Sequence, residues 1–156
     1  ALDGHSGIRL VVKPHPRYDD MAIYRLLTER YPWVTIVNQI MLDRLLPASD
    51  AVIMANSAST AAIEALLLDR PVIWIRPSTR YPPLFSFFEE GVLTIGRRSE
   101  IGPILAKFVD SPEYRESVAQ KGRQWLPTLV AYRDGSATDA VVNAIDRLVG
   151  EMVGKT

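Results

Sequence analysis

Two short polar turns carry the residues of this chain that are best suited to chemistry. The first, Lys13-Pro14-His15-Pro16, follows an apolar stretch, and its prolines hold the backbone extended around one histidine. An imidazole with a fixed direction could donate to a phosphate or polarise a leaving group, and Lys13 adds positive charge. The structural alternative is that His15 bonds to a neighbouring loop while Lys13 points to solvent. We favour the functional interpretation, with His15 as the catalytic candidate.

The second turn, Asn56–Thr60, contains three hydroxyls, on Ser57, Ser59 and Thr60. Here an apolar run passes directly into a helical pattern. Free backbone N–H groups and the helix dipole favour anions at such a point, and hydroxyls add donors to phosphate oxygens. Glu64 lies one turn further on, where its carboxylate could accept hydrogen bonds from sugar or ribose hydroxyls. The alternative is that Ser57 or Ser59 caps the helix and Glu64 complements its dipole.

Other patterns with catalytic potential are weaker or missing. The sequence lacks the glycine-flanked nucleophile elbow of hydrolases, the glycine-rich dinucleotide fingerprint and the Walker phosphate loop. Metal-ligand spacing is not seen, so we expect neither a metal nor a separate cofactor. Arg76, Arg80 and Tyr81 could line the same crevice as the two turns, although surface arginines are common. The pair Glu89-Glu90 is interpreted as part of a solvated loop.

Composition limits the classes of protein to which the chain can belong. Its 156 residues suit a single domain over 1–156, and 47% hydrophobic with 23% charged residues is typical of a soluble globular protein. Eighteen basic and eighteen acidic residues argue against a general nucleic-acid binder. Without cysteine, thiolate chemistry and disulfides are excluded. No apolar run approaches the roughly 20 residues of a membrane span, and the ragged start suggests a piece of a longer protein.

Alternating strand and helix patterns must position the two turns. We predict strands at 8–13, 34–37, 51–55, 71–76 and 92–95, and helices at 20–31, 59–68, 99–110, 112–125 and 136–153. Residues 41–46 are expected to form a brief helix or turn, and 77–91 a loop with one short helical turn. This alternation predicts an α/β fold, with a doubly wound parallel sheet in three layers, as in a Rossmann-like domain.

The simplest strand order for such a sheet is 2-1-3-4-5, which makes strands 8–13 and 51–55 neighbours. Ligands of open α/β sheets bind beyond the carboxyl ends of the strands, where the strand order reverses. Both polar turns would then lie at that point. We therefore expect them to converge on one ligand.

Four segments resemble the C-terminal domain of GT-B-fold enzymes: Val11–Pro16, Ser49–Ile53, Asn56–Ala65 and Pro71–Ile73. The closest groups are glycosyltransferases of bacterial surface polysaccharides, of capsule and polysialic-acid type, and the teichoic-acid glycerophosphotransferases. Sugar-nucleotide 2-epimerases share the same framework. The resemblance covers about residues 8–150, including Asp134–Ala137 before an amphipathic helix.

The resemblance implies a site for a nucleotide-activated sugar or CDP-glycerol, which serves as the donor substrate. In that family the corresponding histidine and hydroxyls contact the nucleotide phosphates, which would assign those roles to His15, Ser57, Ser59 and Thr60. Glu64 would correspond to an acidic position near the ribose. This chain departs from the pattern because it reads Ser-Ala-Ser-Thr in place of adjacent serines. That departure leaves open which hydroxyl contacts phosphate.

The resemblance also implies parts that this chain does not contain. An N-terminal domain with the acceptor site would precede Ala1, together with a further strand of the present domain. We expect the isolated fragment to be inactive, and the full-length enzyme to act in the cytoplasm, with peripheral association at the inner face of the membrane.

Two other functions stay open at this stage. One is a sugar-nucleotide 2-epimerase, which would need further acidic and basic groups from the missing half. The other is a non-catalytic α/β interaction module, whose interface would be the loop at Phe85–Phe88. A receiver-like signalling domain shares the strand order, but Ala55-Asn56-Ser57 stands where such a domain needs an acidic strand end.

Overall fold

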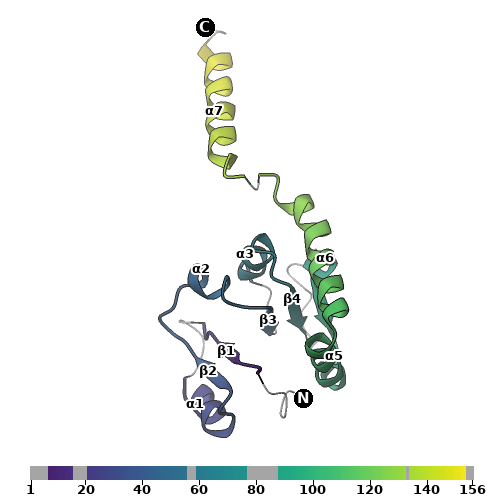
Figure 1. Cartoon of the computed structure of the whole chain (residues 1–156). Helices are drawn as coiled ribbons and strands as arrows, with labels where there is room; N and C mark the ends of the chain where they lie inside the picture. Colours follow the sequence, from purple (N-terminus) through teal and green to yellow (C-terminus); the bar gives the residue numbers. More distant parts are fainter. Residues whose placement is uncertain (1–6, 16–20, 56–58, 77–87, 133, 154–156) are drawn as a thin grey trace.

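A computed structural model describes residues 7–15, 21–55, 59–76, 88–132 and 134–153. The chain is an α/β protein with parallel strands flanked by helices, as the sequence predicts (Figure 1). The elements are β1 (Leu10–Val12), α1 (Met21–Arg30), β2 (Val34–Ile36), α2 (Leu42–Leu45), β3 (Val52–Ala55), α3 (Ala61–Leu67), β4 (Val72–Ile75), α4 (Phe88–Gly91), β5 (Leu93–Ile95), α5 (Arg98–Asp110), α6 (Pro112–Leu129) and α7 (Ala137–Val153).

The strands form two separate parallel sheets. β1 pairs with β2 in the register Leu10↔Val34, while β4 lies between β3 and β5 in the larger sheet. The expected continuous order 2-1-3-4-5 is therefore wrong, because β1 and β3 form no ladder in the part of the chain that the structure describes. Each sheet keeps the predicted neighbours. Local periodicity identifies strands, whereas pairing between strands far apart in sequence depends on long-range packing.

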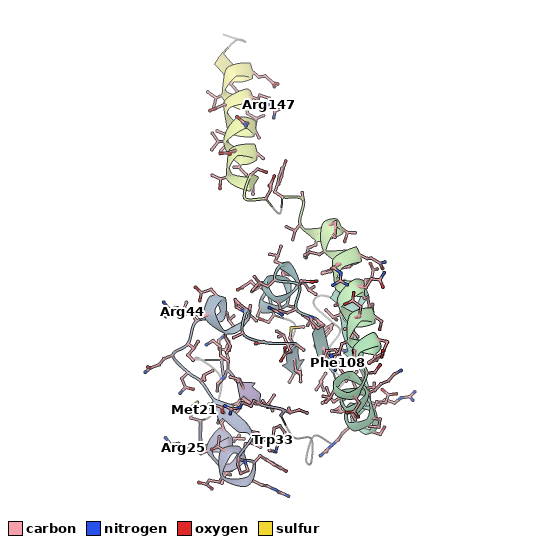
Figure 2. The ribbon with its side chains drawn as sticks, in the orientation of Figure 1. Met21, Arg25, Trp33, Arg44, Phe108 and Arg147 are labelled. Atoms are coloured by element: carbon pink, nitrogen blue, oxygen red, sulfur yellow. The ribbon has the colours of Figure 1, made fainter. Side chains whose placement is uncertain are left out.

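The larger sheet has helices on both faces. Along β4, Val72 and Trp74 face one way and pack with α3 residues such as Leu66, because side chains alternate along a strand. Ile73 points to the other face and packs with Leu105 and Phe108 of α5. Figure 2 labels Phe108 on α5, beside the sheet. This part of the molecule has the predicted three layers.

Helix α6 joins both apolar layers. Its Trp125 and Leu126 belong to the cluster on the α3 face, and Val118 belongs to the cluster on the α5 face. Close contact with α6 depends on small residues. A Cβ at Gly122 would lie 2.6 Å from Leu66 Cδ2. Lys121 of α6 also donates from Nζ to the carbonyl oxygens of Glu89 and Val92, both at 2.9 Å, which fixes α4 against α6.

Local hydrogen bonds place the ends of the C-terminal helices as the sequence suggests. Ser111 caps α6, since its Oγ accepts from Tyr114 N at 3.1 Å, and Pro112 follows at the first helical position. Before α7, the Asp134 carboxylate accepts from Ser136 N at 3.0 Å, and Gly135 has a φ of +87°. That turn directs α7 away from the rest of the molecule (Figure 1).

Two helices keep apolar faces uncovered. On α1, Ile23 and Leu26 are 61% and 66% exposed, and on α7, Ile145, Leu148 and Met152 are all more than half exposed. Figure 2 labels Arg25 on α1 and Arg147 on α7, at opposite ends of the molecule. Among the described residues, no helix combines the length and apolar character needed to cross a membrane.

Candidate functional site

The turn after β1 leaves the smaller sheet at a fixed point. Val37 N donates to Val12 O at 3.0 Å, so the parallel pairing continues to the last residue of β1. Beyond it, Lys13 is half-buried, Pro14 is buried and His15 is exposed. The buried proline anchors the turn and leaves the imidazole accessible to a ligand. Pro16 lies outside the described residues.

The turn before α3 is described from Ser59 onward, and Ser57 lies outside the described residues. Ser59 and Thr60 are exposed. Ser59 Oγ accepts from Ala61 N at 3.3 Å, so this hydroxyl supports the local turn, as the capping alternative proposes. Thr60 is the N-cap residue of α3 and makes no side-chain cap hydrogen bond. Both hydroxyls remain at the surface, where they can meet a ligand.

The backbone amides at the start of α3 form hydrogen bonds within the chain. Ala62 N donates to Ser59 O at 3.0 Å, and the amides of Ile63 and Glu64 donate to Thr60 O at 2.9 and 3.2 Å. With Ala61 N bonded to Ser59 Oγ, none of these four amides is left for an anion. The first amides of α3 are therefore bonded within the chain, while Asn56 and Ser57 of the predicted anion turn lie outside the described residues. A phosphate contact at Ala61 to Glu64 would use side chains.

Glu64 lies one turn into α3 with an exposed side chain. Its carboxylate is therefore accessible to a polar group of a ligand. The same position also suits an acid in the first turn of a helix, where it complements the dipole.

The two turns do not share one sheet edge. Lys13 and His15 follow a strand of the smaller sheet, while Ser59 and Thr60 follow a strand of the larger one. The order 2-1-3-4-5 would have brought the two turns together through pairing of β1 with β3. In the ranges that the structure covers, β1 and β3 form no such ladder.

Arg76, one of the weaker candidates in the sequence, makes several defined contacts in the structure. Arg76 directly follows β4, and its N–H donates to Ile95 O at 2.8 Å. Its guanidinium forms an ion pair with Glu89 of α4 and lies over the Trp74 ring, 5.5 Å from the centroid. The Arg76 side chain is only 21% exposed. The spacing in the sequence could have indicated this contact, because Arg76 stands two residues after Trp74 and hence on the same face of the strand.

A hollow of about 270 Å³ lies at the opposite end of the larger sheet. Its lining includes three arginines and three acids: Arg70, Arg115, Arg123, Asp50, Asp69 and Glu116. One of these arginines pairs with two of the acids. Arg123 donates to Asp69 at 3.0 Å and pairs with Glu116, and the hydrogen bond to Asp69 is the main reason that the pKa of Arg123 is raised. The hollow is balanced in charge and distant from the predicted site.

In the described ranges, no group of three or more His, Asp or Glu residues is placed to hold a metal ion.

A comparison of the chain with known protein families found no match, and a comparison with curated proteins found no significant match.

Proposed function

We propose that the chain is the donor-nucleotide-binding part of a GT-B-type transferase of bacterial surface-polysaccharide synthesis, acting on a nucleotide-activated sugar or CDP-glycerol. One observation carries the proposal. Polar turns follow two parallel strands of an α/β fold: Lys13 and His15 after β1, and Ser59 and Thr60 after β3. Cationic, imidazole and hydroxyl groups at the carboxyl ends of parallel strands suit a phosphate-bearing ligand.

The reaction would be a displacement. An acceptor hydroxyl oxygen forms a bond to the sugar carbon, or to the phosphorus of the glycerol donor, and the bond to the nucleotide breaks. Negative charge then develops on the leaving phosphate. His15 and Lys13 would stabilise that charge as donors, with Ser57, Ser59 and Thr60 adding hydrogen bonds. Glu64 would accept from the ribose.

The uncovered apolar faces support a second domain in the full-length protein. Exposed Leu26 on α1 and exposed Leu148 on α7 belong to surfaces that a monomeric domain usually buries. The acceptor-binding domain implied by the resemblance would supply such cover. In this proposal the catalytic base belongs to that domain, and the present chain binds nucleotide without completing the reaction.

Calorimetric titration of the 156-residue chain with CMP, CDP and UDP tests the proposal. We expect binding of at least one nucleotide, weakened about tenfold by His15→Ala and by Ser59→Ala, because each removes a hydrogen bond to a charged group. Ser117→Ala is the matched control, since Ser117 is an exposed residue of α6 whose hydroxyl bonds only within its helix, to Tyr114 O.

Failure of all three nucleotides to bind would overturn the proposal and favour the non-catalytic interaction module. Equal weakening by Ser59→Ala and Ser117→Ala would show that the Ser59 hydroxyl does not contact the nucleotide.

A further inference from the structure

Arg76 and Glu89 form an ion pair at the carboxyl edge of the larger sheet, on the strand next to β3. The register Ala55↔Ile75 places Arg76 one residue beyond the last paired position of β3 and β4. Neighbouring strands lie about 4.8 Å apart, so the Arg76 backbone is close to the point where the chain leaves β3 toward Ser59. The pair therefore lies at the edge where the proposed donor phosphates would bind.

The guanidinium also lies on the face of that sheet that α3 covers. Arg76 follows Trp74 by two residues and stacks over its ring, and Trp74 packs in the apolar cluster that contains Ala62 and Leu66 of α3. Sheet edge and sheet face thus both agree with the position of Ser59 and Thr60, which immediately precede α3.

The indole beside Arg76 carries a buried donor without an acceptor among the described residues. Trp74 is 2% exposed, and its Nε1–H has no acceptor among the described residues. Glu89 is the acceptor that the described structure provides for the Arg76 guanidinium, and its side chain is 42% exposed. A half-buried cation paired with a partly solvated carboxylate can exchange that partner for a phosphate, because guanidinium binds both in the same bidentate geometry.

On the basis of the proposed function, we propose that Arg76 binds the donor phosphates and that Glu89 is an internal competitor that occupies the guanidinium in the free protein. Binding of a nucleoside diphosphate breaks the ion pair and replaces it with a phosphate contact. The free energy of nucleotide binding is then less favourable by the free energy needed to break the Arg76–Glu89 ion pair. Glu89 acts as a positioning and specificity residue, since a weak anion cannot displace it.

The test compares Glu89→Gln and Arg76→Gln by calorimetry with CMP, CDP and UDP. Arg76→Gln should weaken diphosphate binding about tenfold or more, since a hydrogen bond to a charged group is lost. Glu89→Gln should strengthen diphosphate binding several-fold, with a smaller gain for CMP. A gain in affinity cannot result from damage to the fold, so this variant stays informative even if Arg76→Gln is unstable.

Glu116→Gln is the matched control, because Glu116 also pairs with an arginine, Arg123, but at the hollow far from this edge. It should leave nucleotide affinity unchanged. If the wild-type chain binds none of the nucleotides, the proposed function and this assignment both fail. If wild type binds but Glu89→Gln gives no gain, or loses affinity as Tm falls, the pair is only structural and the competitor role alone is overturned.

Discussion

The two sheets differ sharply in how well they are packed. Around β3, β4 and β5, apolar side chains from α3, α5 and α6 form two clusters, with Trp74, Ile73 and Leu126 almost fully buried. Around β1 and β2, among the described residues before Met41, only Pro14 and Val34 are buried, and α1 buries no residue. One half of the candidate site therefore rests on a dense core and the other half on a thinly covered pair of strands.

This difference indicates where stability and adaptability are concentrated. Ser59, Thr60 and Arg76 extend from the packed unit, which fixes their positions before a ligand arrives. Lys13 and His15 extend from the unit with few buried contacts, where local opening costs less free energy. A ligand that spans both would bind a rigid half and order a softer one.

The largest expected effect comes from truncating the same residue type in each region. Leu126 is fully buried, so Leu126→Ala should lower the free energy of unfolding by about 2–5 kcal/mol through lost burial and a cavity. Leu26 is 66% exposed, and Leu26→Ala should change it by no more than about 0.5 kcal/mol. Urea denaturation measures both. Similar losses of unfolding free energy in the two variants would show that α1 is covered in solution, and would contradict the difference in packing between the two sheets.

A glycine-to-alanine pair tests the close approach of α6. At Gly122 the added Cβ would meet Leu66 at 2.6 Å, so Gly122→Ala should destabilise the chain by about 1–3 kcal/mol. Gly150 in α7 has open space around it, and Gly150→Ala should stabilise that helix by about 0.5–1 kcal/mol. Thermal unfolding followed by circular dichroism should give shifts of opposite sign. Shifts of the same sign would contradict the packing described.

Hydrogen exchange measures the local stability of the two sheets at single backbone amides. Val37 N, bonded to Val12 O in the smaller sheet, should exchange at least about tenfold faster than Arg76 N, bonded to Ile95 O in the larger sheet. Both amides extend a parallel ladder by one bond, so they form a matched pair. Saturating CDP should narrow the difference if a nucleotide binds both halves. Equal protection in the free chain would indicate one cooperative unit.

The smallest effect concerns the turn before α7. The Ser136 hydroxyl, followed by the Ser136 N–H, holds the pKa of Asp134 below its usual value. A lowered folded pKa gives stability above the unfolded pKa of about 3.9, and that stability is lost as pH falls through the folded pKa. Ser136→Ala should move the Asp134 pKa back upward in an NMR titration. Glu113, lowered mainly by a backbone hydrogen bond, is the internal control and should not move.

Much of the fold follows from local patterns. The β-branched run at 71–76 and the serine–proline pair before α6 predict β4 and the α6 cap closely, since alternation and capping depend on neighbours in sequence. The position of one polar turn follows too, because Lys13 and His15 come directly after β1, and His15 is exposed. The occupied amides of α3 did not follow, because only the closed turn at Ser59 and Thr60 reveals them.

The sequence by itself determined which segments are strands and helices, that the strands run parallel, and which turns carry polar groups. The tertiary structure decided that β1 pairs with β2 and not with β3 among the described residues, and that Arg76, directly after β4, pairs with Glu89 of α4. The physical reason is the distance along the chain over which each interaction acts. Periodicity and capping are energies between near neighbours in the chain, whereas strand order and ion pairing across 13 residues depend on how buried apolar faces fit together in space.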